Sequence, residues 1–246
     1  MNTIVYYVLS AFAVLITLTV HEYCHGYAAY KLGDPTAKNL GRLTLNPIKH
    51  IDPFGALCML LFHFGWAKPV PINSRYLRNP KRDFAFIALA GPLSNLIMSF
   101  VSAFIYLAFY AAVKNVEFTN EFLFAIVDNT LDFFWIFHLI NLGIAIFNLI
   151  PIPPLDGSRI LSVILPSRIY FGIMRYERTI YYILLGWLFL GDHVSSFLLS
   201  LPLVSSNPIL SAIASFISLS DMLGLAINAL SSAIIRLLQL IPFLKF

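Results

Sequence analysis

Long apolar runs separated by short polar loops dominate this chain of 246 residues. A helix needs about 20 mostly apolar residues to cross a bilayer, because each residue advances it by about 1.5 Å. Four stretches meet this requirement, and we predict spanning helices over residues 3–30, 84–113, 133–150 and 179–199. Proline and glycine should end two of them, the first near Gly33 and the third at Pro151, because neither residue favours continuing a helix.

Residues 54–66 form a further apolar run that is too short to span. Asp52-Pro53 precedes it and Lys68-Pro-Val-Pro71 follows it. Such a run is typical of a re-entrant or interfacial element, so we predict a hairpin dipping into the membrane between the first two spans.

The tail from Ser206 to Phe246 has a different pattern, with polar residues recurring at helical spacing among Leu, Ile and Ala. These residues are Asp221, Asn228, Ser232, Arg236 and Gln239. One polar stripe on an apolar helix indicates an amphipathic helix. We expect it to pack on the periphery of the bundle, with a position in the headgroup plane or a role in self-association as alternatives.

Composition places the chain in a membrane. It is 59% hydrophobic and 11% charged, whereas soluble domains carry about 25% charged residues. The sequence predicts an all-α polytopic membrane protein forming one domain, residues 1–246, with a core over 1–165 and accessory helices over 166–246. The net charge of +4 does not indicate nucleic-acid binding, because the basic residues flank membrane segments. Two cysteines suggest no disulfide framework.

The basic residues also predict a topology. Nine lie between the first two predicted spans and four follow the third, together 13 of the 16. By the positive-inside rule these loops are cytoplasmic. The end of the first span and the break after the third therefore approach the same, cytoplasmic side.

The first predicted span contains the candidate chemistry, His21-Glu22-Tyr23-Cys24-His25. In a helix His21 and His25 lie about 40° apart on one face, so two imidazoles can share a metal while Glu22 reaches its water. The alternative is that the five-residue pattern arose by chance and that the two histidines only form hydrogen bonds inside the helix bundle. A charged carboxylate inside a bilayer costs about 2.5 to 3.5 kcal/mol, which favours the functional interpretation.

Catalytic zinc takes three protein ligands and keeps one position for water. Asp156 is the best candidate for the third, because the prolines before it unwind the chain where the third span reaches the cytoplasmic side. The alternative is that Asp156 caps the helix starting near Gly157. The H-E-x-x-H motif, and the shared cytoplasmic side of the two segments, favour Asp156 as a metal ligand over Asp156 as a helix cap.

Three motifs in this order resemble the site-2 protease family of intramembrane zinc metalloproteases. They are the H-E-x-x-H sequence, Gly91-Pro-Leu-Ser-Asn95, and the stretch from Asn148 to Gly157. The resemblance covers about residues 21–160, the family's three-helix catalytic core, and residues 54–73 resemble its membrane-inserted hairpin. It implies one catalytic zinc ion bound by His21, His25 and Asp156, with Glu22 as general base and Asn148 stabilising the oxyanion.

The resemblance further implies an endopeptidase that cuts transmembrane proteins or remnant signal peptides in the plasma membrane of a prokaryote. Many relatives carry an inserted PDZ-like or nucleotide-sensing domain, for which this chain has no room. Substrate choice must then rest on the membrane core, the amphipathic tail or a partner, either a second copy or an adaptor protein. We interpret Asn95 and Asn141 as amides that bond a neighbouring helix.

Two other classes of function compete with hydrolysis. One is an inactive or zinc-dependent protein that binds membrane segments without cutting them, and the other is a metal or ion transporter with polar residues lining a pathway. Glu22 discriminates between them, because neither alternative needs a base beside the metal ligands.

Overall fold

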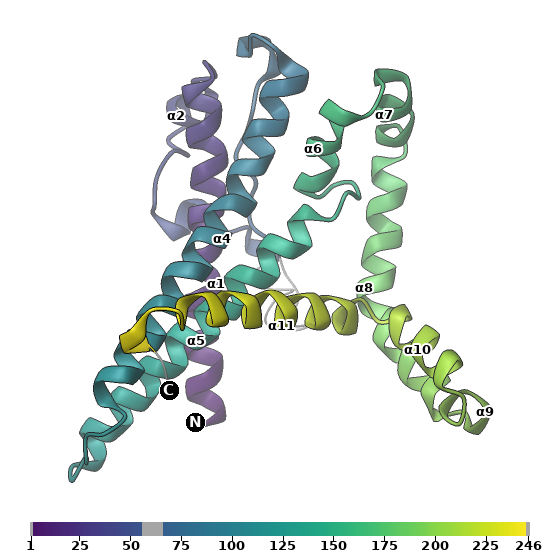
Figure 1. The fold of residues 1–246 in the computed structure, drawn as a ribbon. Helices are drawn as coiled ribbons and strands as arrows, with labels where there is room; N and C mark the ends of the chain where they lie inside the picture. Colours follow the sequence, from purple (N-terminus) through teal and green to yellow (C-terminus); the bar gives the residue numbers. More distant parts are fainter. Residues whose placement is uncertain (1, 56–65, 245–246) are drawn as a thin grey trace.

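The computed structural model describes residues 2–55 and 66–244, and this part of the chain is helical without strands (Figure 1). Five helices are long and apolar enough to cross a membrane: α1 (Thr3–Lys31), α4 (Pro80–Val113), α5 (Glu121–Leu149), α8 (Glu177–Ser200) and α11 (Leu219–Leu238). The shorter helices are α2 (Thr36–Asn39), η1 (Pro47–Lys49), η2 (Ser74–Tyr76), α6 (Asp156–Ile164), α7 (Ser167–Met174), α9 (Pro202–Ser205), α10 (Pro208–Ile217) and η3 (Pro242–Leu244). The predicted all-α polytopic architecture is confirmed.

Asparagine caps explain where two long helices begin. The side chain of Asn79 accepts from the amide of Arg82, and Pro80 occupies the first turn of α4. Asn120 caps α5 by accepting from Phe122 and Leu123. Because α5 starts at Glu121, our predicted start at residue 133 was wrong: the acidic first turns, which we excluded from the apolar window, continue the helix.

Helices α1, α4 and α5 pack together as a three-helix core, with α4 in contact with both others (Figure 1). Several alanines of these helices are fully buried, among them Ala13 and Ala29 on α1 and Ala145 on α5. Small side chains let helix backbones approach closely, which is how membrane helices associate without a hydrophobic driving force.

The prolines after α5 end that helix as predicted, and the chain then turns into α6. Two polar contacts hold α6 against the start of α4: Ser162 donates to the carbonyl of Lys81 at 3.2 Å, and the Lys81 ammonium donates to the carbonyl of Leu165 at 3.0 Å. The C-terminal half of α6 is thereby held beside the start of α4.

The C-terminal region departs from the single amphipathic helix that we predicted over residues 206–246. It forms two helices, α10 and α11, which meet at Ser218. The side chain of Ser218 accepts from the amide of Asp221 and so starts a new helix there. Helix α11 does pack against the bundle, where it contacts α5 and α8 (Figure 1). The polar stripe that we expected to face the bundle is instead exposed at Asp221, Asn228, Ser232 and Arg236.

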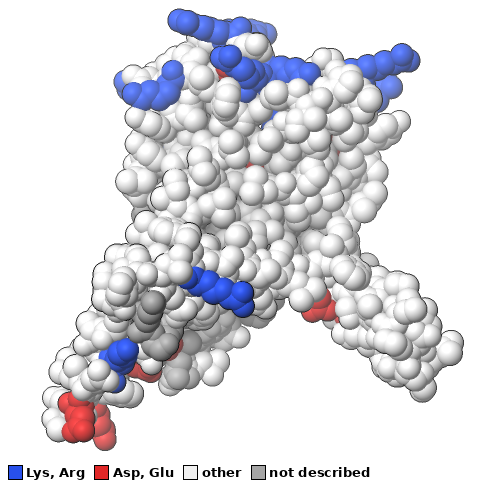
Figure 2. Space-filling view, in the orientation of Figure 1, with Lys and Arg blue, Asp and Glu red and all other residues white. Residues whose placement is uncertain are grey.

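Residues 56–65 of the predicted hairpin lie outside the described part of the chain. On its two sides, Ile51 and Ala67 form an isolated antiparallel bridge, and the amide of Lys68 donates to the carbonyl of His50 at 2.8 Å. Residues 66–72 follow without helix, and Lys68 and Val70 each precede a proline, which favours extended backbone. Val70 meets Glu22 and Gly26, so this segment lies beside α1. Figure 2 shows Lys and Arg gathered at one end of the molecule, where α2 and α7 lie in Figure 1.

Candidate metal centre

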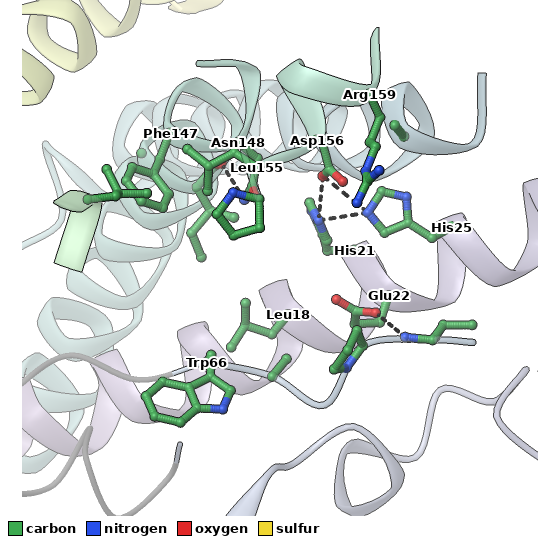
Figure 3. Close-up of a pocket in the computed structure, with 18 of the residues that line it drawn as sticks. Leu18, His21, Glu22, His25, Trp66, Phe147, Asn148, Leu155, Asp156 and Arg159 are labelled. Carbon is green, nitrogen blue, oxygen red and sulfur yellow. Dashed lines mark hydrogen bonds and ion pairs between the residues drawn. The ribbon is translucent and has the colours of Figure 1, made fainter. Parts of the chain in front are cut away.

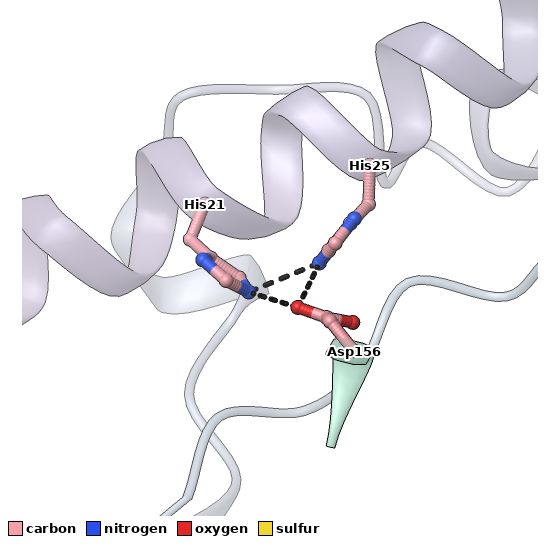
Figure 4. Close-up of side chains that lie close together, drawn as sticks. All are labelled: His21, His25 and Asp156. Carbon is pink, nitrogen blue, oxygen red and sulfur yellow. Dashed lines mark hydrogen bonds and ion pairs between the residues drawn. The ribbon is translucent and has the colours of Figure 1, made fainter. Parts of the chain in front are cut away.

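His21 and His25 point from one face of α1 toward Asp156 at the start of α6 (Figure 4). Their Nε2 atoms are 3.0 Å apart, and each lies 3.2 Å from Oδ2 of Asp156. Both imidazoles are buried, 4% and 7% exposed. The structure thus brings together the three side chains that the sequence proposed as metal ligands.

The outer nitrogen of each ring has its own partner. His25 Nδ1 lies 2.7 Å from the carbonyl oxygen of Ile87, which can only accept, so Nδ1 carries the proton and Nε2 is left with its lone pair. His21 Nδ1 lies 3.2 Å from the side-chain amide of Asn95. Such partners fix the tautomer and direction of metal-binding histidines. Both rings are oriented with Nε2 toward Asp156.

Gly91 explains how α4 passes so close to the two rings. A Cβ at this position would lie 2.5 Å from Nε2 of His25 and 2.6 Å from Cε1 of His21. Any side chain here would collide with the imidazoles, so the glycine makes the space that the centre occupies.

Asp156 is the first residue of α6, and the capping position is Leu155, which has no side-chain cap. The alternative that Asp156 acts as a helix cap is therefore wrong. Gly157 permits the tight turn, since a Cβ there would lie 2.3 Å from the carbonyl oxygen of Leu149.

The donor set fits zinc. Two imidazole nitrogens and a carboxylate oxygen are ligands that zinc takes at catalytic sites, and at about 2.0 to 2.2 Å from a tetrahedral ion they would be roughly 3.3 Å apart. The separations of 3.0 and 3.2 Å agree with this. Oδ2 of Asp156 is buried without a hydrogen bond, as expected of an atom that an ion would satisfy. In the described part of the chain, residues 2–55 and 66–244, one group of three or more His, Cys, Asp or Glu side chains lies close enough to share a metal ion. It consists of His21, His25 and Asp156.

Glu22 stands beside the centre with one carboxylate oxygen fixed. Its Oε2 accepts from the amide of Val70 at 2.8 Å. Pro69 and Pro71 flank Val70 and lack an N–H, so Val70 supplies the donor of this three-residue run. The extended segment thereby holds the Glu22 side chain at the centre, as Figure 3 shows.

A cavity of about 1110 Å³ opens from the metal centre into the helix bundle. His21, Glu22, His25 and Asp156 line it at one place, together with Asn148 (Figure 3). Most of its remaining walls are apolar, for example Leu18 and Phe147. Mostly apolar cavities with a few convergent polar groups are typical of binding sites.

Comparison with known proteins agrees with this geometry. The sequence matches Peptidase family M50 over residues 9–191, about three quarters of the chain. The chain belongs to peptidase family M50, the site-2 protease family. This M50 protein is a zinc metalloprotease and an integral membrane protein.

Two bacterial relatives support the assignment. "Putative zinc metalloprotease YwhC" of Bacillus subtilis (strain 168) is 42% identical over 171 residues, covering 68% of this chain and 75% of the relative. "Putative zinc metalloprotease Rip2" of Mycolicibacterium smegmatis (strain ATCC 700084 / mc(2)155) is 30% identical over 148 residues, covering 58% of this chain. The chain spans 52% of that second relative. No solved structure matches the chain.

Two polar residues of this M50 protein were interpreted too narrowly from sequence. Asn95 does bond a neighbouring helix as expected, but its partner is a ring of the metal centre. Asn141 was expected to do the same, whereas its amide donates to Phe137 within its own helix at 2.8 Å. A hint for Asn95 was its place four residues after Gly91, one helical turn along the face that meets the rings.

His138 had no assigned role from sequence. In the M50 fold it is fully buried between α4, α5 and α11: Nδ1 lies 2.8 Å from Oγ of Ser99, and Nε2 lies 2.9 Å from Oγ of Ser231. The partners are 39 and 93 residues away along the chain, so no local pattern could have indicated them.

Proposed function

We propose that this M50 protein is an intramembrane endopeptidase that hydrolyses peptide bonds in or near transmembrane segments of its substrates. The depth of the metal centre supports this. His21 lies ten residues before Lys31, where α1 ends, which is about 15 Å along the helix. That is about half of a hydrocarbon core roughly 30 Å thick, so the cavity at the centre takes a peptide bond inside the membrane.

His21, His25 and Asp156 are the residues that would hold the zinc ion. When bound, zinc supplies a Lewis acid and lowers the pKa of a coordinated water to about 7. Glu22 is the general base: Val70 occupies Oε2, which leaves Oε1 free to accept the proton of the attacking water. The same carboxyl group then returns the proton to the leaving amine.

Asn148 is the proposed donor to the oxyanion. Its amide nitrogen carries two hydrogens, and one is donated to the carbonyl of Ile144 at 3.0 Å. The second is left for the oxygen on which charge develops, in the cavity that both Asn148 and the metal ligands line. Removing one such donor costs about 2.7 to 4 kcal/mol of transition-state stabilisation in a well-studied protease.

The substrate must present an unwound backbone, because a helix keeps its carbonyls in hydrogen bonds. The segment over residues 66–72 borders the cavity through Trp66, Ala67 and Val70. Pro69 and Pro71 lack an N–H and the amides of Lys68 and Val70 already donate, so a substrate strand would donate hydrogen bonds to backbone carbonyls of this segment. Suitable substrates are transmembrane proteins or remnant signal peptides.

The basic end of the molecule (Figure 2) faces the cytoplasm by the positive-inside rule, in the plasma membrane of a prokaryote.

The test is a Glu22→Gln variant assayed on a purified transmembrane substrate in liposomes. Glutamine keeps the size of the side chain and can still accept from Val70, but it cannot act as a base. We expect zinc content to be retained and cleavage to be abolished. Glu117→Gln, an exposed residue far along the chain, is the matched control. Cleavage by Glu22→Gln at the wild-type rate would remove the proposed mechanism.

A further inference from the structure

Several segments of the chain form the walls of the cavity at the metal centre. Helices α1 and α5 supply the wall that carries most of the polar side chains. Helix α8 contributes residues such as Leu184 and Leu188, and α11, which packs against α5, contributes Leu223 and Ile227. The family match ends at residue 191, so α11 lies beyond it. A segment outside the shared family region therefore borders the same space as the metal ligands.

One face of α11 is directed inward. Leu219, Leu223, Ile227 and Ser231 follow each other at intervals of four residues, which places them on one side of a helix. Leu219 and Ser231 are buried, and Leu223 and Ile227 between them line the cavity. Leu225, two residues before Ile227, is 66% exposed. The rotation of α11 about its axis is thus defined, with Ile227 in the cavity and Leu225 outside.

Hydrogen bonds fix α11 in the middle and at its start. Ser231, one turn after Ile227, lies 2.9 Å from Nε2 of His138. At the start of α11, Oδ1 of Asp192 accepts from the hydroxyls of Ser218 and Ser220, both at 2.7 Å. The Ser231–His138 bond is buried, so no water competes with it and it holds α11 in a defined position against α5. Asp192 and Ser220 are exposed, so their bonds add less.

Packing fixes the far end. Leu238 of α11 and Leu244 of η3 form a buried cluster with Ala103 and Leu107 of α4. The Ile227 side chain lies against α5 at Gly143. A Cβ added to Gly143 would be 3.2 Å from Cδ1 of Ile227. The Ile227 side chain therefore occupies the space between α11 and α5 and limits the room in the cavity.

From these contacts we propose that α11 is part of the substrate-binding site and that Ile227 sets the size of apolar side chain accepted beside the scissile bond. The inference rests on the proposed endopeptidase function and adds a specificity element to it. The ligand is an apolar side chain of a membrane segment, since the wall facing it is Leu and Ile. Shortening Ile227 enlarges the cavity and favours a larger substrate residue.

The test uses one transmembrane substrate whose residues on either side of the cut are changed, one at a time, to Ala or to Phe. The Phe and Ala substrates compete in the same liposomes, and the ratio of their kcat/KM values is measured for each position. For Ile227→Ala we expect this ratio to rise by about tenfold or more at one position, the discrimination typical of losing a few carbon atoms from an apolar pocket. Leu225→Ala, on the outer face of α11, should leave the ratio at its wild-type value.

A second variant tests the positioning of α11. Ser231→Ala removes the bond to His138 and should weaken the size preference at the same substrate position, whereas Ser232→Ala, an exposed neighbour, should not. Because a general loss of folding lowers both rates together, it leaves the ratio unchanged. Equal ratios for wild type, Ile227→Ala and Leu225→Ala, while Glu22→Gln is inactive, would overturn this inference and leave the endopeptidase intact. Cleavage that persists in Glu22→Gln would instead overturn the proposed function.

Discussion

Asn95 on α4 meets His21 on α1 inside the core, 3.2 Å from the ring nitrogen that faces away from Asp156. Asn95 is fully buried. To bind a metal through Nε2, His21 must carry its proton on Nδ1. Asn95 can accept that proton through its amide oxygen, since oxygen and nitrogen of an amide exchange places by a flip. Asn95 is thus a positioning residue for a metal ligand.

We expect Asn95→Leu to weaken zinc binding by about 10- to 100-fold, the loss usual for partners of ligating histidines. Asn95→Asp should retain most of the affinity, because a carboxylate also accepts from Nδ1. Zinc dissociation constants from competition with a chromophoric chelator distinguish the two. Equal weakening by both substitutions would show that Asn95 only fills space.

Asp156→Ala should reduce zinc affinity by more than Asn95→Leu does, because it removes a direct ligand and leaves two. Metal content of the purified protein and helix content by circular dichroism are the measurements. Glu117→Ala, in an exposed loop, controls for the loss of a carboxylate. Full zinc occupancy in Asp156→Ala would exclude Asp156 from the ligand set.

The grouping of His21, His25 and Asp156 could be predicted from sequence, because two of them share one helix face and a proline-marked break precedes the third. His21, Glu22 and His25 share a helix face by spacing alone, and the prolines before Asp156 showed where the chain leaves the third span. The partner of His21 could not be predicted in this way. Its identity depends on how α4 is rotated against α1, and helices that are apolar on all sides carry no periodicity that reports this rotation.

The same limit explains the C-terminal region. The cap of Ser218 on the amide of Asp221 is local, whereas the second partner of Ser218, Asp192, lies 26 residues earlier along the chain. Likewise His138 is explained only by Ser99 and Ser231 on two other helices. Long-range polar contacts between membrane helices fix the bundle, whereas the sequence pattern fixes only the helices themselves.

Gly91→Ala should harm the centre through crowding. The new methyl group would meet His25 and His21 at 2.5 to 2.6 Å, so the rings or α4 must move, and overpacking of this kind costs about 1 to 3 kcal/mol. We expect a lower unfolding temperature in detergent and reduced zinc affinity. Gly186→Ala on α8 has nothing within 4 Å and should be neutral or slightly stabilising, because alanine favours helix.

Gly157→Ala should separate metal binding from folding. A Cβ there would lie 2.3 Å from the Leu149 carbonyl oxygen and 2.5 Å from that of Ile150, so the turn between α5 and α6 must open and carry the adjacent Asp156 carboxylate away from the two rings. The histidines keep their own partners on α4, so the three-helix core remains. We expect unchanged helix content, reduced zinc affinity and lost cleavage. Gly172→Ala on α7, with open space around it, is the control; wild-type zinc affinity in Gly157→Ala would mean that Asp156 reaches the centre without this turn.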